Sequence, residues 1–260
     1  MIRGIIAIVI LDLKRFWKEK TRLVAGLIQP LLYLFVLGAG IGASSKMGGG
    51  DYKRFIFPGT MGLSMLFTAT FSAITIVFDR QIGFFKAVLV APVPRPAIAL
   101  GKVIAGALQA LAQGFVLLPF APLAGVPLTV LETVEMIGAM AIASLTFSTI
   151  GVAFACRFKS TTVFPIVSNA VLLPMFFMSG GLYPLYNAPA WMQMAAHFDP
   201  VAYAVDLMRG TLMGKYFFPV PLSIGALAVT IALLVWAAVR VFNRGEDDSS
   251  LGATQFNWRR

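Results

Sequence analysis

The stretch MIGAMAIASLTFSTIGVAFAC, residues 136–156, contains no Asp, Glu, Lys or Arg and decides the class of fold. A helix needs about 20 apolar residues to cross the hydrocarbon core of a bilayer, and this stretch is long enough. Backbone N–H and C=O groups find no water inside lipid, so a spanning segment satisfies them within a helix. The stretch therefore predicts a transmembrane helix.

Five more charge-free runs occupy residues 23–45, 55–78, 103–131, 160–198 and 216–239. Of the 260 residues, 58% are hydrophobic and only 12% are charged, whereas a soluble domain has about 25% charged residues. Gly180, Gly181 and Pro184 break the run 160–198, and its second half is too polar to span. We predict an all-α integral membrane protein with six spans, at about 23–44, 56–78, 102–124, 134–156, 162–182 and 221–242.

The distribution of Lys and Arg predicts the orientation of these spans. With the N-terminus inside, sixteen of the 21 cations fall in cytoplasmic segments and five in outer loops. Cytoplasmic loops of membrane proteins carry the excess of Lys and Arg. We therefore expect both termini to be cytoplasmic and the chain to lie in the cell (inner or plasma) membrane. The net charge of +10 sits in short clusters between apolar runs, which argues against a nucleic-acid partner.

The two ends of the chain differ from the membrane domain predicted over residues 23–242. Residues 1–22 predict an amphipathic helix on the cytoplasmic leaflet, because apolar residues recur at helical spacing and cations crowd its end. An alternative is that its apolar part only lengthens the first span, but the cations from Lys14 to Arg22 argue against this. Residues 243–260 are polar and predict a cytoplasmic tail.

The predicted inner loop, DRQIGFFKAVLVAPVPRPAIALGK at residues 79–102, is the first segment that indicates a function. Its first part predicts a short amphipathic helix, and three prolines then force an extended turn. A stiff, charged and aromatic loop favours docking to another protein, although a plain connector is the alternative. The expected docking residues are Asp79, Arg80, Gly83, Phe84, Phe85, Lys86, Pro92 and Arg95.

The predicted outer loop 183–220 is the second such segment, and it contains AHFDPVAYAVDLMRG at residues 196–210. Asp199 is expected to cap a helix with Pro200 in its first position. Asp206 and Arg209 are three residues apart and are expected to pair, and Gly210 is expected to end the helix. With the preceding short amphipathic piece, this predicts a helical hairpin in the outer leaflet. Its expected key residues are Asp199, Pro200, Tyr203, Asp206 and Arg209.

Together with the stretch Met178–Pro184, MSGGLYP, these segments resemble the membrane subunits of type-2 ABC exporters. The resemblance covers nearly the whole chain. The matching stretches are Asp79–Lys86, Leu89–Pro92, Gly101–Lys102, Met178–Pro184, Asp199–Pro200, Tyr203–Asp206 and Arg209–Gly210. Many relatives have Glu in place of Asp79 and Asn in place of Asp199.

The resemblance implies a subunit of six spans that works as a dimer with itself or a similar permease. Two separate ATPase subunits bind ATP and Mg²⁺, and the loop 79–100 contains the coupling helix that enters them. Relatives export drugs, lipid-linked glycans or lipo-oligosaccharides. A substrate path at the dimer interface suits a hydrophobic or amphipathic substrate, because the spans offer aromatic side chains and no central charge. The expected path residues are Gln29, Tyr33, Phe67, Phe71, Asn169, Phe176 and Phe177.

Two other classes of function remain open from the residues themselves. The chain has no P-loop, no HExxH and no GxSxG pattern, so it is not expected to be an enzyme or to hold a cofactor or metal. An ATP-independent facilitator or channel, or a scaffold for another membrane complex, needs no ATPase partner. For the polar residues within spans, such as Gln29 and Asn169, hydrogen bonding between helices is favoured over contact with a substrate.

Overall fold

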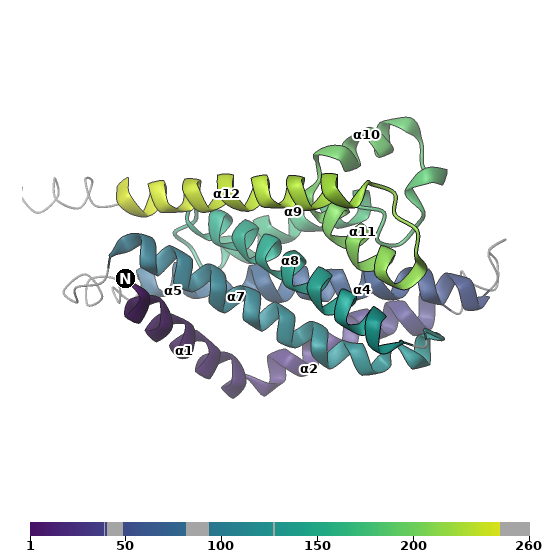
Figure 1. Ribbon diagram of the computed structural model, residues 1–260. Helices are drawn as coiled ribbons and strands as arrows, with labels where there is room; N and C mark the ends of the chain where they lie inside the picture. Colours follow the sequence, from purple (N-terminus) through teal and green to yellow (C-terminus); the bar gives the residue numbers. More distant parts are fainter. Residues whose placement is uncertain (39, 41–48, 82–93, 127, 245–260) are drawn as a thin grey trace, which may run out of the picture.

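The computed structural model describes residues 1–38, 40, 49–81, 94–126 and 128–244, and this part of the chain is helical without a β-strand. Its helices form an elongated bundle (Figure 1). They are α1 (Ile2–Lys18), α2 (Lys20–Leu32), the π-helical turn η1 (Tyr33–Leu37), α4 (Gly49–Ser72), α5 (Ile74–Gln81), α7 (Arg95–Leu117), the 3₁₀ turns η2 (Leu118–Phe120) and η3 (Pro122–Ala124), α8 (Val130–Ala155), α9 (Val163–Met178), the 3₁₀ turn η4 (Leu185–Asn187), α10 (Ala190–Phe198), α11 (Pro200–Met213) and α12 (Val220–Arg244). The predicted all-α class is confirmed.

Within the described residues, 4 helical segments are long and apolar enough to cross a membrane: 52–81, 96–120, 130–155 and 220–241. Residues 2–18 and 23–37 meet at 69° and make a fifth if they form one broken span. α9 is apolar but has only 16 residues. Length and composition therefore give four or five candidate spans, and they do not confirm the predicted number of six.

α1 is amphipathic, and the bend after it turns the chain into α2. Asp12 and Phe16 of α1 are buried, whereas Ile6 and Trp17 are at least half exposed. An apolar stripe on the outer side of such a helix suits the boundary between headgroups and acyl chains. α2 contains Pro30 and continues into the π-helical turn η1. Proline removes the helix bond to the carbonyl four residues earlier, so its effect lies before Pro30 and does not account for the π-helical turn after it.

Close approach of α4, α7 and α8 depends on small residues. Gly151 of α8 lies against the backbone of Thr70, and Gly106 of α7 lies against the hydroxyls of Ser72 and Ser148. Small residues let helix backbones approach within a membrane, where packing replaces the hydrophobic effect as the driving force. α4 is interrupted at Ala73, whose N–H bonds to the carbonyl of Thr70 in a tighter turn.

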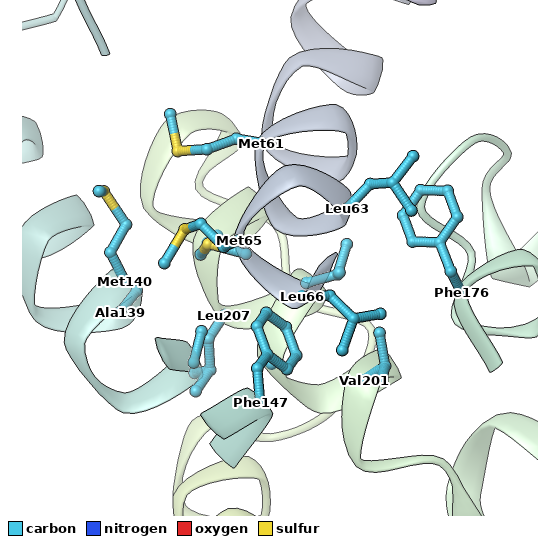
Figure 2. Close-up of a cluster of buried hydrophobic side chains, with 14 of the residues drawn as sticks. Met61, Leu63, Met65, Leu66, Ala139, Met140, Phe147, Phe176, Val201 and Leu207 are labelled. Carbon is cyan, nitrogen blue, oxygen red and sulfur yellow. The ribbon is translucent and has the colours of Figure 1, made fainter. Parts of the chain in front are cut away.

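The buried apolar side chains form two groups. The larger one, here called the large core, joins α4, α8, α11 and neighbouring segments (Figure 2). The other, here called the small core, joins α5, α7, α8 and α9, and contains Ile76, Val103 and Phe164. The large core takes in α4 residues up to Ala69, whereas the small core begins at Ala73. The interruption of α4 therefore falls between the two cores.

The two ends of the bundle carry different elements. The N-terminus and the last turn of α12 lie at one end, here called the N-terminal end (Figure 1). α10 lies towards the opposite end, here called the α10 end. Both ends of the described chain, residues 1 and 244, therefore lie on the same side of the bundle.

Candidate functional site

Three helices converge at the N-terminal end, and two of them flank the predicted coupling segment in the sequence. α5 ends at Gln81, and α7 begins at Arg95. α1 packs along α7. Gly101 of α7 lies against Ile8 of α1, and a Cβ atom on Gly101 would be 3.0 Å from the Cβ of Ile8. The amphipathic helix therefore touches the first turns of the helix that follows the coupling segment.

Buried charges join these three helices. The Lys102 ammonium of α7 lies 3.0 Å from Oδ2 of Asp12 on α1 and 3.1 Å from Oδ2 of Asp79 on α5. It also donates to the hydroxyl of Thr75, at 3.0 Å. Arg15 approaches from the rim, 3.4 Å from Asp79 and 3.8 Å from Asp12. We call Asp12, Arg15, Thr75, Asp79 and Lys102 the Lys102 cluster.

The geometry of the Lys102 cluster satisfies the ammonium group. Lys102 is 6% exposed, and its three N–H donors meet the three oxygen partners contributed by α1 and α5. Two carboxylates and two cations balance in charge. Buried ions need such pairing, because the effective penalty of removing one from water is several kcal/mol. The cluster thus fixes the positions of α1, α5 and α7 relative to one another.

The last turn of α5 is also fixed on its other side. Nη1 of Arg80 donates to the carbonyl of Cys156 at 2.9 Å, at the end of α8. Nε2 of Gln81 donates to the carbonyl of Lys159 at 3.1 Å, and the Thr161 hydroxyl donates back to Oε1 of Gln81 at 3.1 Å. Three consecutive residues of α5 therefore contact different neighbours. Asp79 binds α1 and α7, and Arg80 and Gln81 bind the connection between α8 and α9.

The predicted docking residues take different places. Asp79 is 3% exposed and lies inside the Lys102 cluster, rather than on a docking surface. Arg80 is partly buried at the root of the segment. Arg95 is the first residue of α7. The other five, Gly83, Phe84, Phe85, Lys86 and Pro92, lie outside the described residues.

Sequence reasoning missed the partners of Asp79. From the sequence, Lys102 is identified only as the end of the predicted inner loop, and Asp12 falls unremarked within the predicted amphipathic helix. A signal for Asp12 exists, because at helical spacing it falls on the same face of α1 as Ile5, Ile8 and Phe16. An acid on an inward face needs a buried cation, but the sequence does not say which one.

Two helices, α10 and α11, occupy the region predicted to form the outer hairpin. The carboxylate of Asp199 accepts from the N–H of Val201 at 2.9 Å, and Pro200 is the first residue of α11, as predicted. The Tyr203 hydroxyl donates to the carbonyl of His197 at 2.8 Å and ties the two helices together. Burial raises the pKa of Asp199 to about 7, against the opposing effect of the hydrogen bond from Val201, and its Oδ2 has no hydrogen-bond partner.

Two details of this hairpin were predicted wrongly. α11 continues past Gly210 to Met213 and ends at Gly214, which has φ 63°. Asp206 and Arg209 do not pair with each other: Asp206 accepts from the N–H groups of Phe217 and Phe218 at 3.0–3.1 Å. Arg209 instead donates to the carbonyl of Gly180 at 2.7 Å. Buried backbone groups in the neighbouring turns need partners, and these side chains supply them.

The predicted path residues lie on two helical faces and in the core. Gln29 of α2 and Tyr33 of η1, which continues α2, are half-buried, with Nε2 of Gln29 3.4 Å from the Tyr33 hydroxyl. The rings of Phe67 and Phe71 on α4 stack with centroids 5.7 Å apart and are also half-buried. On α9, Asn169 and Phe177 are exposed, whereas Phe176 is fully buried in the large core (Figure 2). No contact groups these residues into one site.

A bundle of long apolar helices, with buried ion pairs that hold α1, α5 and α7 together at one end, defines a helical membrane protein. The sequence model of the family described as ABC-2 type transporter matches residues 3–213, and the chain belongs to this family. It is similar to Nodulation protein J of Rhizobium leguminosarum bv. viciae, at 30% identity over 224 residues, covering 84% of this chain and 85% of that protein. It is also similar to the inner membrane transport permease YadH of Escherichia coli (strain K12), at 27% identity over 231 residues, covering 87% and 89%. The chain is a membrane permease subunit of an ABC-type transporter.

Proposed function

We propose that the chain forms the translocation path of an ATP-driven exporter and works as a dimer. Separate ABC-type ATPase subunits bind ATP and Mg²⁺ and supply the energy, because the sequence itself contains no P-loop. The substrate is hydrophobic or amphipathic: a drug, a lipid or a lipid-linked glycan. Membership in the ABC-2 family and the names of the relatives, a nodulation protein and a transport permease, support this class.

The proposed topology has six spans with both termini cytoplasmic. α2 with the residues after it is the first span, and α9 is the fifth. α1 lies on the cytoplasmic leaflet, and α10 with α11 forms the outer hairpin. The common location of the N-terminus and the end of α12 supports an even number of spans (Figure 1). The sixteen cations assigned to the inner segments support the orientation.

The Lys102 cluster is the observation that carries the proposed coupling mechanism. Lys102 and Asp79 are separated by 23 residues, and the segment between them contains the proposed coupling helix. Their ion pair closes the base of this segment, and Asp12 adds α1 to the same pair. A displacement of the coupling helix by the ATPase is therefore transmitted to α1, α5 and α7 together, rather than absorbed by a loose loop.

The proposed substrate path lies between the two permease subunits. The half-buried residues Gln29, Tyr33, Phe67 and Phe71 support this, because they lie on adjacent helices, α2 and α4, and remain partly accessible in one subunit. Asn169 and Phe177 of α9 add a second accessible strip.

A pull-down of the tagged chain from its native membrane in mild detergent tests the proposal. We expect an ABC-type ATPase to co-purify in roughly equimolar amount. Gly83→Pro should abolish transport while the chain still inserts, because proline breaks a helix interior, and Gly83→Ala is the control that keeps a helix. A chain that purifies without an ATPase and mediates passive flux in liposomes would instead favour an ATP-independent facilitator or channel.

Single-cysteine labelling tests the topology. Cys156 is the only cysteine and is buried, so Cys156→Ala gives a silent background. Cysteines placed at Ser45 and Ala188 should react with an impermeant maleimide in intact cells, and one at Ser249 only after permeabilisation. Reversal at any position contradicts the orientation.

A further inference from the structure

A cavity of about 420 Å³ opens between the start of α4, the turn around η4 and the connection from α11 to α12. Its lining includes Phe55, Tyr186, Arg209, Lys215 and Tyr216. None of the proposed coupling or path residues lines it. Its volume falls in the range of small-molecule sites, which is about 300–1,000 Å³.

Among the charged side chains of the cavity, the one carboxylate is already occupied, whereas an arginine keeps an unmatched donor. Both oxygens of Asp206 already accept from backbone N–H groups. Arg209 is 6% exposed, and its Nε has no hydrogen-bond partner. Burial lowers the pKa of Arg209 to about 10, so the guanidinium is protonated at neutral pH. Lys215 and Tyr216 are exposed and make no hydrogen bond to another described residue.

The walls of the cavity are apolar and aromatic. The Arg209 guanidinium lies 3.9 Å from the centroid of the Phe55 ring, which holds it from one side. The ring of Tyr216 packs directly against Gly210 of α11. Tyr186 is mostly exposed and Leu185 is buried. Tyrosine rings at the mouth of a cavity provide flat faces for a sugar ring or an acyl chain.

We propose that this cavity binds the oxyanion of an amphipathic molecule. A carboxylate, sulfate or phosphate group meets Arg209 and Lys215, and the adjoining sugar or apolar part lies against Tyr186 and Tyr216. The lining has two cations, Arg209 and Lys215, and one carboxylate, Asp206, whose oxygens already accept hydrogen bonds. The cavity therefore favours a negatively charged ligand over a neutral or positively charged one. Two sources supply this chemistry, a membrane phospholipid and an acidic saccharide. The site extends the proposed function, but its binding is independent of the ATPase.

The test uses the full-length chain in neutral detergent and two probes that differ only in one carboxylate. These are p-nitrophenyl glucuronide and p-nitrophenyl glucoside, whose binding is measured by equilibrium dialysis. We expect the glucuronide to bind at least tenfold more tightly. Lys215→Ala should lower its affinity up to about fivefold, since Lys215 is exposed and an exposed ion pair contributes at most about 1 kcal/mol, and Lys215→Arg should restore it.

Controls separate the cavity from the positive charge of the whole chain. Lys53→Ala removes a cation of α4 that does not line the cavity, and it should leave binding unchanged. Arg209→Lys keeps a charge but removes the guanidinium, and should weaken binding in a variant that still purifies. Equal affinity for the two probes, or an equal loss from Lys53→Ala and Lys215→Ala, overturns the proposal.

A competition arm identifies the source of the oxyanion. Lysophosphatidylglycerol and lysophosphatidylcholine have the same chain, but only the first has a net negative headgroup. Displacement of bound glucuronide by lysophosphatidylglycerol alone supports the site and assigns it to an anionic lipid. Retention of the glucuronide against both supports the site and assigns it to an acidic saccharide. Displacement by both to the same extent contradicts selection for charge. Because no ATPase is present, failure here leaves the transport proposal untouched.

Discussion

Replacing Lys102 with Met should destabilise the chain by about 3–5 kcal/mol, the usual cost of breaking a buried ion pair from one side. The structure gives the same magnitude independently. Asp12 and Asp79 each lie within 3.1 Å of one ammonium nitrogen, so their nearest oxygens are within about 6 Å of each other. At that distance and an effective dielectric constant near 20, two unit charges repel by about 3 kcal/mol. Without Lys102, only Arg15 at the rim offsets this repulsion.

The assay is unfolding of the purified chain in mixed micelles, followed by tryptophan fluorescence. Adding Asp12→Asn to Lys102→Met removes one of the two repelling charges. The double variant should therefore recover most of the loss and be more stable than the single one. Lys18→Met, an exposed cation of α1, is the matched control and should change stability by at most about 0.5 kcal/mol. Stability of Lys102→Met within that margin, or simple addition of the two single effects, would refute the assignment of a buried, coupled cluster.

Three further predictions follow from single contacts. The native chain should lose stability as pH rises from about 4 through 7, because the pKa of Asp199 is about 7 in the folded state and 3.8 ordinarily. Asp199→Asn keeps the helix cap and should remove this loss. Unfolding midpoints measured across this pH range in both chains check it. Gly59→Ala should lower the free energy of unfolding by about 1–3 kcal/mol, because the added methyl meets a backbone carbonyl. Gly138 has open space around it, so Gly138→Ala should be neutral or stabilising in the same unfolding assay. Arg80→Glu should lower the yield of co-purified ATPase, because the new carboxylate faces the carbonyl at the end of α8 to which Arg80 donates; an unchanged yield would contradict it.

Most helices could be predicted from the absence of charge, but their ends could not. The run beginning at Met136 locates α8, yet the helix begins at Val130, because Thr129 and Glu132 form a capping box before it. A search for charge-free runs leaves this first turn out because it contains an acidic residue. An acidic residue there nevertheless stabilises the N-terminus of the helix. α9 stops at Met178 because Gly180 adopts φ 73°, which turns the chain. Its 16 residues leave the fifth predicted span shorter than expected.

The candidate site was predictable only along one segment of chain. The composition of residues 79–102 indicated a docking loop, and Asp79 and Arg80 do lie at its root. The partners of Asp79 come from α1 and α7, and Lys102 and Asp12 are 90 residues apart. Periodicity identifies the face of a helix on which a residue lies, but not the helix that it meets. The predicted pairing of Asp206 with Arg209 was wrong for the same reason. Residues three apart in a helix can form an ion pair, but here each side chain binds a backbone group from another part of the chain instead.

The division of the interior into two cores gives the proposed coupling a direction. The Lys102 cluster lies among helices of the small core, and the proposed anion cavity lies beside the large core. The segment 52–81 runs between them, from Phe55 beneath Arg209 to Asp79 beside Lys102. The 30 residues of this segment correspond to roughly 45 Å of helix. The helix is interrupted at Ala73, between the two cores. α5 and α7 contribute to the small core and Ile8 of α1 packs against it, so in the proposed coupling a displacement of the coupling helix acts on the small core first. In this proposal the displacement reaches the cavity through α4, which holds Gly59 against Gly181, in the turn that accepts from Arg209, and the Phe55 ring against the Arg209 guanidinium.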